Sequence, residues 1–64
     1  MKLDNWHDVA ARLDDLDISR AELARRCGLS ESTVVKGLRD NRKLQGATRR
    51  AVEAVLHKLM GAAA

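Results

Sequence analysis

Positively charged side chains are concentrated in one part of this 64-residue chain, and the chemistry they can do is the non-covalent binding of anions. Nine of the twelve Lys and Arg residues lie between Arg20 and Arg50. Residues 1–19 hold two cations and five aspartates, a net charge of −3, whereas residues 20–64 have a net charge of +6. Such segregation is typical of a protein with a polyanionic partner, although a solvated charged surface gives the same composition.

Catalytic or metal-binding chemistry finds little support in the sequence. His7 and His57 have no Cys or Asp partners at the spacing of metal ligands, so no metal site is predicted. Cys27 is the only cysteine, and its place on an inner helical face predicts a buried structural thiol. No Ser/His/Asp or Cys/His arrangement is evident, and so short a chain offers little room for a substrate cleft. We therefore expect no enzyme, no cofactor and no small-molecule site.

Four helical patterns must position the cations. The chain has no Pro and no alternating strand pattern, which predicts an all-α protein. The first pattern places Trp6 on its apolar face, so Trp6 is expected in the core, and Asp4 or Asn5 can cap its start. The four patterns cover approximately residues 5–16, 19–28, 30–39 and 46–60.

The two central patterns have the spacing of helices that cross steeply. Ser19 and Glu22 predict a capping box, with the serine at the cap and the glutamate reaching back. Ala24 supplies the small side chain at the closest approach, Gly28 tolerates the positive φ of a tight turn, and Val34 is placed to pack against the first helix. This pattern indicates a helix-turn-helix, whose second helix enters the major groove of DNA.

The stretch "ISRAELARRCGLSESTVVKGLRDNRK", residues 18–43, resembles the helix-turn-helix of phage-repressor transcription regulators (Cro/cI-like, or XRE). Within it, "SESTVVKGLR" also looks like the recognition helix of LexA-fold phage-type repressors. The later "ATRRAVEAVLHKL" resembles the helix that follows the motif in lactose-repressor-type regulators. That family begins directly with the motif, whereas here a helix containing Trp6 comes first, so it ranks second.

Two positions depart from the phage-repressor pattern. Gly37 falls where many members have an apolar residue, and Leu38 or Val35 is therefore expected to complete the packing. Arg20 stands where many members have glutamine, so the family's base contacts do not transfer directly.

The resemblance implies an all-α, lambda-repressor-like domain of four helices, with a fifth left open, over residues 1–60. Residues 61–64 are then a frayed tail or the start of a linker. It also implies a transcriptional regulator, most often a repressor, that binds double-stranded DNA as a homodimer on a palindromic operator. Leu59 and Met60 are candidate dimer contacts, or they complete the core. A single cysteine and the lack of an apolar run of roughly 20 residues fit a cytoplasmic protein with no membrane partner. The resemblance implies that it is a nucleoid-associated protein of a bacterium or phage.

Helical periodicity selects the candidate base-reading side chains. If Val34 and Leu38 face inward, four side chains of the third helix face outward: Glu31, Ser32, Val35 and Lys36. Lys36 can donate to guanine, Glu31 can accept from cytosine N4, Val35 can contact a thymine methyl, and Ser32 can bond a base edge or a phosphate. Two alternatives stay open, because Glu31 also suits the dipole at a helix start and Val35 also suits the core.

Cations and small polar groups around this helix are candidate ligands of the DNA backbone. These candidate phosphate-binding residues are Arg20, Ser30, Arg39, Arg42, Lys43, Thr48 and Arg49. The rival hypothesis is a helical protein-interaction module that keeps the same fold without reading DNA. In that case the basic segment would bind an acidic protein.

Overall fold

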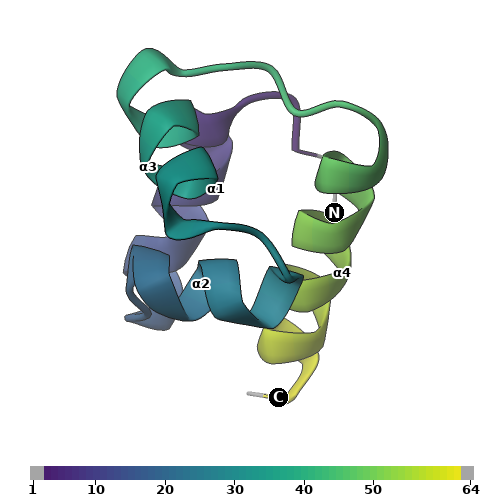
Figure 1. Cartoon of the computed structure of the whole chain (residues 1–64). Helices are drawn as coiled ribbons and strands as arrows, with labels where there is room; N and C mark the ends of the chain where they lie inside the picture. Colours follow the sequence, from purple (N-terminus) through teal and green to yellow (C-terminus); the bar gives the residue numbers. More distant parts are fainter. Residues whose placement is uncertain (1–2, 63–64) are drawn as a thin grey trace.

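The computed structural model describes residues 3–62, which form four helices (Figure 1). These are α1 (Trp6–Leu16), α2 (Arg20–Cys27), α3 (Glu31–Asp40) and α4 (Gly46–Ala62). Within residues 3–62 there is no β-strand and no fifth helix, only an isolated antiparallel bridge between Asn5 and Lys43. The predictions of an all-α chain and of four helices are confirmed. α4 continues two residues beyond its predicted end, and the last two residues of the expected tail lie outside the described residues.

Side-chain caps fix where the first two helices begin. The Asn5 side chain accepts the Asp8 amide at 3.2 Å, and the Asp8 carboxylate accepts the Asn5 amide at 3.4 Å, which completes a capping box at α1. At α2 the Ser19 hydroxyl accepts the Glu22 amide at 3.1 Å, as predicted. The other half of the predicted capping box, a hydrogen bond from the Ser19 amide to the Glu22 carboxylate, is wrong.

The Glu22 carboxylate turns away from the cap. It pairs with Arg25 at 3.1 Å and with Arg26 at 3.3 Å, three and four residues further along the helix. Both guanidinium groups lie one helical turn away on the same side, and together they outcompete a single backbone amide for the carboxylate.

A short turn sets the position of α3 against α2. Gly28 ends α2 with φ +72°, and the Leu29 amide bonds back to the Ala24 carbonyl at 2.9 Å. Ser30 then caps α3 by accepting the Thr33 amide at 3.1 Å. Only three residues separate the two helices, which run in clearly different directions (Figure 1).

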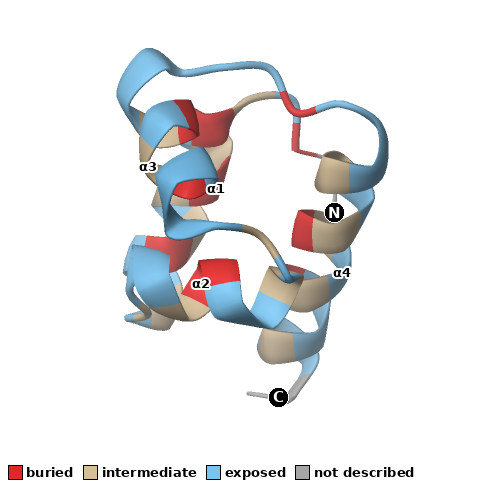
Figure 2. Ribbon diagram, in the orientation of Figure 1, coloured by how far each residue is buried: buried red, intermediate tan, exposed pale blue. Residues whose placement is uncertain are grey.

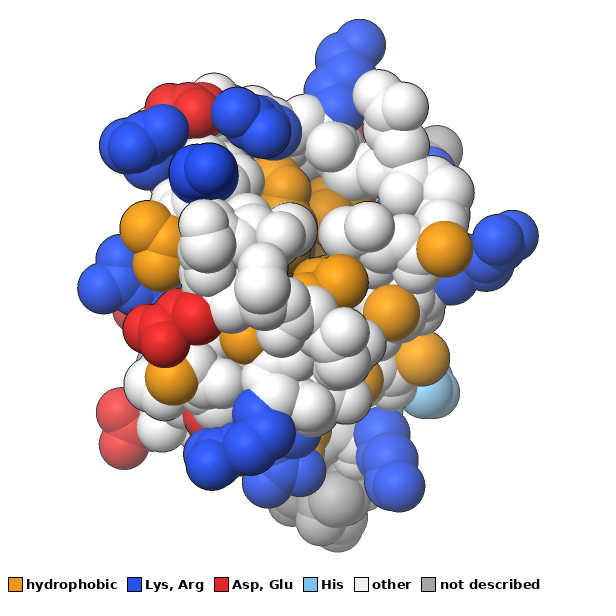
Figure 3. Space-filling view, viewed as in Figure 1, with side chains coloured by type: hydrophobic (Ala, Val, Ile, Leu, Met, Phe, Trp, Pro, Cys, Tyr) orange, Lys and Arg blue, Asp and Glu red, His pale blue; other side chains and the backbone are white. Residues whose placement is uncertain are grey.

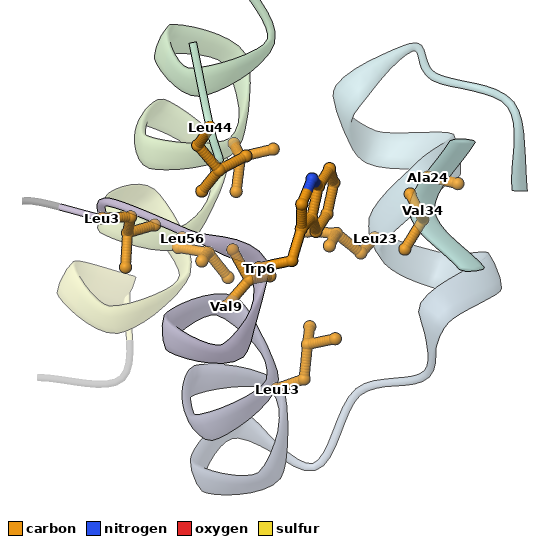
Figure 4. Close-up of a cluster of buried hydrophobic side chains, with 10 residues drawn as sticks. Leu3, Trp6, Val9, Leu13, Leu23, Ala24, Val34, Leu44 and Leu56 are labelled. Atoms are coloured by element: carbon orange, nitrogen blue, oxygen red, sulfur yellow. The ribbon is translucent and has the colours of Figure 1, made fainter. Parts of the chain in front are cut away.

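Every helix has buried positions (Figure 2), and their apolar side chains form one core. Burying an aliphatic side chain of this kind contributes about 1.5–3 kcal/mol, and a core this small gives modest stability. Most of these side chains are shown in Figure 4. The buried set is Leu3, Trp6, Val9, Leu13, Leu23, Ala24, Val34, Leu44, Val52 and Leu56.

The indole of Trp6 fills the place that the glycine of α3 leaves open. Gly37 is buried, and a Cβ there would lie 2.6 Å from the indole Cδ1 and closer still to Cε2 and Nε1. The expectation that Leu38 or Val35 completes the packing is confirmed for Leu38 and not for Val35. Leu38 does pack against the core, but the ring from α1 takes the space itself, and Val35 is half-buried outside the core cluster.

Candidate nucleic-acid interface

A hollow of about 430 Å³ lies between α3, the loop that follows it and the first turn of α4. Hydrophobic surface is visible at its floor and polar surface around it (Figure 3). Five of the residues singled out in the sequence line it: Ser32, Lys36, Arg42, Lys43 and Thr48. Trp6, Thr33 and Gln45 complete the lining. The structure thus brings together side chains from three segments that the sequence analysis had assigned to base reading and to phosphate binding.

The exposed face of α3 carries the candidate base-reading side chains. Val34 and Gly37 are buried on the opposite face of the helix, as the periodicity predicted for Val34. Glu31, Ser32 and Lys36 are exposed. Val35 is half-buried, which leaves part of its side chain at the surface.

Backbone hydrogen bonds hold the basic loop against the start of α1. The Trp6 amide donates to the Arg42 carbonyl at 3.0 Å, and the Leu44 amide donates to the Asp4 carbonyl at 3.0 Å. The Asn41 side-chain oxygen accepts the His7 amide, also at 3.0 Å. The loop that presents Arg42 and Lys43 is therefore fixed by contacts far away in the sequence.

The Asp40 carboxylate forms ion pairs with two of the predicted phosphate-binding residues, Arg39 and Arg42. Arg39 donates to Asp40 through Nε at 3.0 Å and through Nη2 at 3.3 Å, and Arg42 Nη2 lies 3.5 Å from the same carboxylate. The hydrogen bond from Arg39 lowers the pKa of Asp40, so this carboxylate is charged near neutral pH. A DNA phosphate would have to compete with Asp40 for both guanidinium groups. By contrast, Lys36 and Lys43 make no ion pair with any residue in the described range.

Arg49 contributes to the fold rather than to the hollow. It is half-buried, and its Nε donates to the Glu53 carboxylate at 3.4 Å. The same carboxylate accepts the Leu3 amide at 2.8 Å, and this backbone hydrogen bond is the main cause of the lowered pKa of Glu53. The spacing of Arg49 and Glu53, four residues apart on one helix, is the sequence signal that would have revealed this pair.

Two other predicted phosphate ligands also lie away from the hollow. Arg20 lines a separate depression together with Asp14 and Leu38. The Ser30 hydroxyl is engaged at the start of α3, where it accepts the Thr33 amide and lies 2.8 Å from the Thr33 hydroxyl.

Within residues 3–62 no group of three or more His, Cys, Asp or Glu side chains is placed to hold a metal ion. Cys27 is half-buried, and burial raises the pKa of its thiol, which keeps it protonated and poorly nucleophilic. None of the helices in the described range combines the length and the apolar character needed to cross a bilayer.

The lined hollow therefore offers cationic and hydroxyl donors on a firmly held scaffold, and its chemistry suits the binding of an anionic polymer. Comparison of the chain with models of known families, with characterised proteins and with solved structures found no match. The function of this surface accordingly rests on its own geometry and chemistry.

Proposed function

We propose that the chain is a sequence-specific double-stranded-DNA-binding domain in which α2 and α3 form a helix-turn-helix. One observation carries the proposal: Ser32 and Lys36, on the exposed face of α3, share a single hollow with Lys43 and Thr48. A helix that reads bases in the major groove needs its backbone-binding neighbours on the same side, because the phosphates flank the groove.

The contact between α2 and α3 supports the helix-turn-helix assignment. Ala24 and Val34 are both buried, and the left-handed Gly28 lies between them in the sequence. A small residue, a turn glycine and a packed aliphatic residue are what two steeply crossing helices require. We propose the phage-repressor-like arrangement on this basis, with α3 as the recognition helix.

Lys36 is the strongest candidate for direct base reading. It is exposed, has no ion-pair partner among the described residues, and can donate to O6 or N7 of guanine. Glu31 and Ser32 are exposed on the first turn of the same helix, where the N-terminal residues of a recognition helix meet base edges. The exposed part of Val35 can contact a thymine methyl.

Phosphate binding is assigned first to Lys43 and Thr48, and then to Arg42, which must leave Asp40. Arg39 shares that carboxylate and ranks below them. The unpaired amides at the start of α4 add donors beside Thr48. Arg20, Ser30 and Arg49 become secondary candidates because each has another environment or partner.

We propose further that two copies bind a palindromic operator and repress transcription by occlusion, in the cytoplasm at the nucleoid. Half-sites would then be about one helical turn, roughly 34 Å, apart. Met60 is 40% exposed and Leu59 is half-buried near the end of α4, where both are free to contribute to contact between protomers.

Selection of bound sequences from a random duplex pool tests this proposal, followed by titration of the selected duplex at several salt concentrations. We expect an enriched site with two-fold symmetry, and a slope of log K against log[salt] of roughly −3 to −5, from about four or five phosphates per monomer. Arg25→Ala is the matched control, since Arg25 is an exposed cation paired with Glu22 outside the hollow. Absence of binding at low salt would refute the proposal.

A protein-interaction module is the second candidate function. The observation that favours it is a second depression, of about 320 Å³, lined by the aliphatic Val55 and Leu59 between Arg26 and Lys58. Such a surface suits an acidic amphipathic segment of another protein. This candidate expects no duplex binding at low salt.

A further inference from the structure

Trp6 is an almost fully buried side chain with an unused hydrogen-bond donor. Its exposed fraction is 3%, and its indole N–H has no acceptor among residues 3–62. A tryptophan whose ring is mostly buried usually keeps its N–H bonded, either to a protein group or to water. Within the described range the one enclosed polar side-chain atom without a partner is Arg12 Nε. Because the Trp6 Nε1 atom is also without a partner, it must keep some exposed surface, and Trp6 lines the hollow.

The packing of the ring explains how the donor reaches the hollow. The atoms nearest to a Cβ built on Gly37 are Cε2, Nε1 and Cδ1, at nearly equal distances, so the face of the pyrrole ring stacks on Gly37 of α3. On that side of α3, Thr33 and Lys36 line the hollow with Trp6. A side chain at position 37 would displace the ring, so the glycine allows Trp6 to pack between α3 and the hollow.

The surroundings of the donor decide which acceptor it can take. Lys36, Arg42 and Lys43 line the hollow, and no Asp or Glu does. No carboxylate of the lining can therefore serve as the acceptor, and the three cations favour an oxyanion supplied by a bound partner. The first turn of α4 adds backbone amides, and Thr48 adds a hydroxyl.

We propose that Trp6 is a DNA contact, and that its indole N–H donates a hydrogen bond to a phosphate oxygen of the duplex backbone seated in this hollow. The inference rests on the proposed DNA-binding function and deepens it. It gives α1 a direct part in binding, whereas the sequence pattern marks Trp6 as core alone.

The Trp6 indole N–H is uncharged, so its loss should affect duplex binding differently from the loss of a lysine. Removing it should weaken every duplex alike, by roughly 10-fold to 100-fold, as for a hydrogen bond to a charged group. It should leave the salt slope unchanged, because no counterion is released on its account. Lys43→Ala is the contrasting variant, and it should make the slope shallower by about 0.9.

The decisive experiment follows the indole N–H itself by NMR in the wild-type chain. Trp6 is the only tryptophan, so the ¹⁵N-labelled protein has a single indole cross-peak. We expect this peak to move downfield and its exchange with water to slow on addition of the selected duplex. Inorganic phosphate at the same phosphate concentration should leave it unmoved. An equal response to inorganic phosphate would overturn the role in DNA binding.

The Trp6→Phe variant gives the second measurement, with circular dichroism and thermal unfolding as the check on its fold. A folded variant that binds the duplex as tightly as the wild type would overturn the inference. So would α3 amide peaks that shift with the duplex while the indole peak stays in place. In either case the proposed function survives. If no peak shifts and no duplex binds, both the inference about Trp6 and the proposed DNA-binding function fail.

Discussion

Substitution of Gly37 by alanine tests the packing that holds α3 in position. The new Cβ would lie 2.6 Å from the indole Cδ1 of Trp6, where ordinary contacts are about 3.4–4 Å. Inserting a methyl group into a filled core costs about 1–3 kcal/mol. We expect the upper half of that range, because the ring is almost fully enclosed and the Trp6 amide is bonded to the Arg42 carbonyl at 3.0 Å.

A helical glycine also has an intrinsic cost, which the substitution removes. Replacing it by alanine stabilises a helix interior by up to about 1 kcal/mol. The net loss for Gly37→Ala is then roughly 1–2 kcal/mol, which for a domain of this size lowers the Tm by about 5–15 °C. Thermal unfolding followed by circular dichroism measures this shift.

Gly61→Ala is the matched control, because Gly61 is also helical and a Cβ there meets nothing within 4 Å. It should leave the Tm unchanged or raise it slightly. In a Trp6→Leu background the smaller side chain should make room, and Gly37→Ala should then cost nothing. A Gly37→Ala variant as stable as the wild type would refute the reasoning about the Trp6–Gly37 contact.

Three further substitutions test other parts of the structure. Gly28→Ala should destabilise by about 1–2 kcal/mol in chemical denaturation; φ is +72° and the surrounding space is open, so a neutral result would argue against a left-handed turn. Glu53→Gln should flatten the loss of stability in acid. The folded pKa of Glu53 lies below the usual 4.5, so its contribution is present above that pH and is lost as the pH falls through the folded pKa. Unfolding curves of the two proteins that stay parallel through this window would contradict that. Asp40→Asn should release Arg39 and Arg42, tighten duplex binding, and steepen the salt slope by up to about 0.9 per guanidinium; weaker binding would count against phosphate contacts by these arginines.

The helices and their boundaries were predictable because their signals are local. Gly28 and Ser30 are turn and cap residues whose preferences act within a few positions, and both behave as expected. The outward placement of Glu31 and Lys36 follows from helical periodicity once Val34 is buried. The Glu22 carboxylate has two sequence signals, the capping motif behind it and the arginines three and four residues ahead, and local spacing does not decide between them.

The tertiary parts of the site were not predictable from the sequence. The fit of Trp6 against Gly37 joins residues 31 positions apart, and no periodic pattern encodes it. The start of α1 is joined to Arg42 and Leu44 by backbone hydrogen bonds, and such bonds cannot be recognised from the side-chain types in a sequence. Asp40 neutralises the charges of Arg39 and Arg42 only because the side-chain rotamers bring these groups together, and sequence proximity alone does not determine the rotamers.

The affinity of the Lys36→Ala variant for two duplexes tests the central claim most directly, namely that α3 reads bases from this face. The duplexes are the selected site and the same site changed at the single base pair assigned to Lys36. The wild type should discriminate between them by about 1–3 kcal/mol, and the variant should bind both equally, with Arg25→Ala unchanged as the control. An undiminished preference in the variant, or a wild type that binds every duplex alike, would contradict the claim.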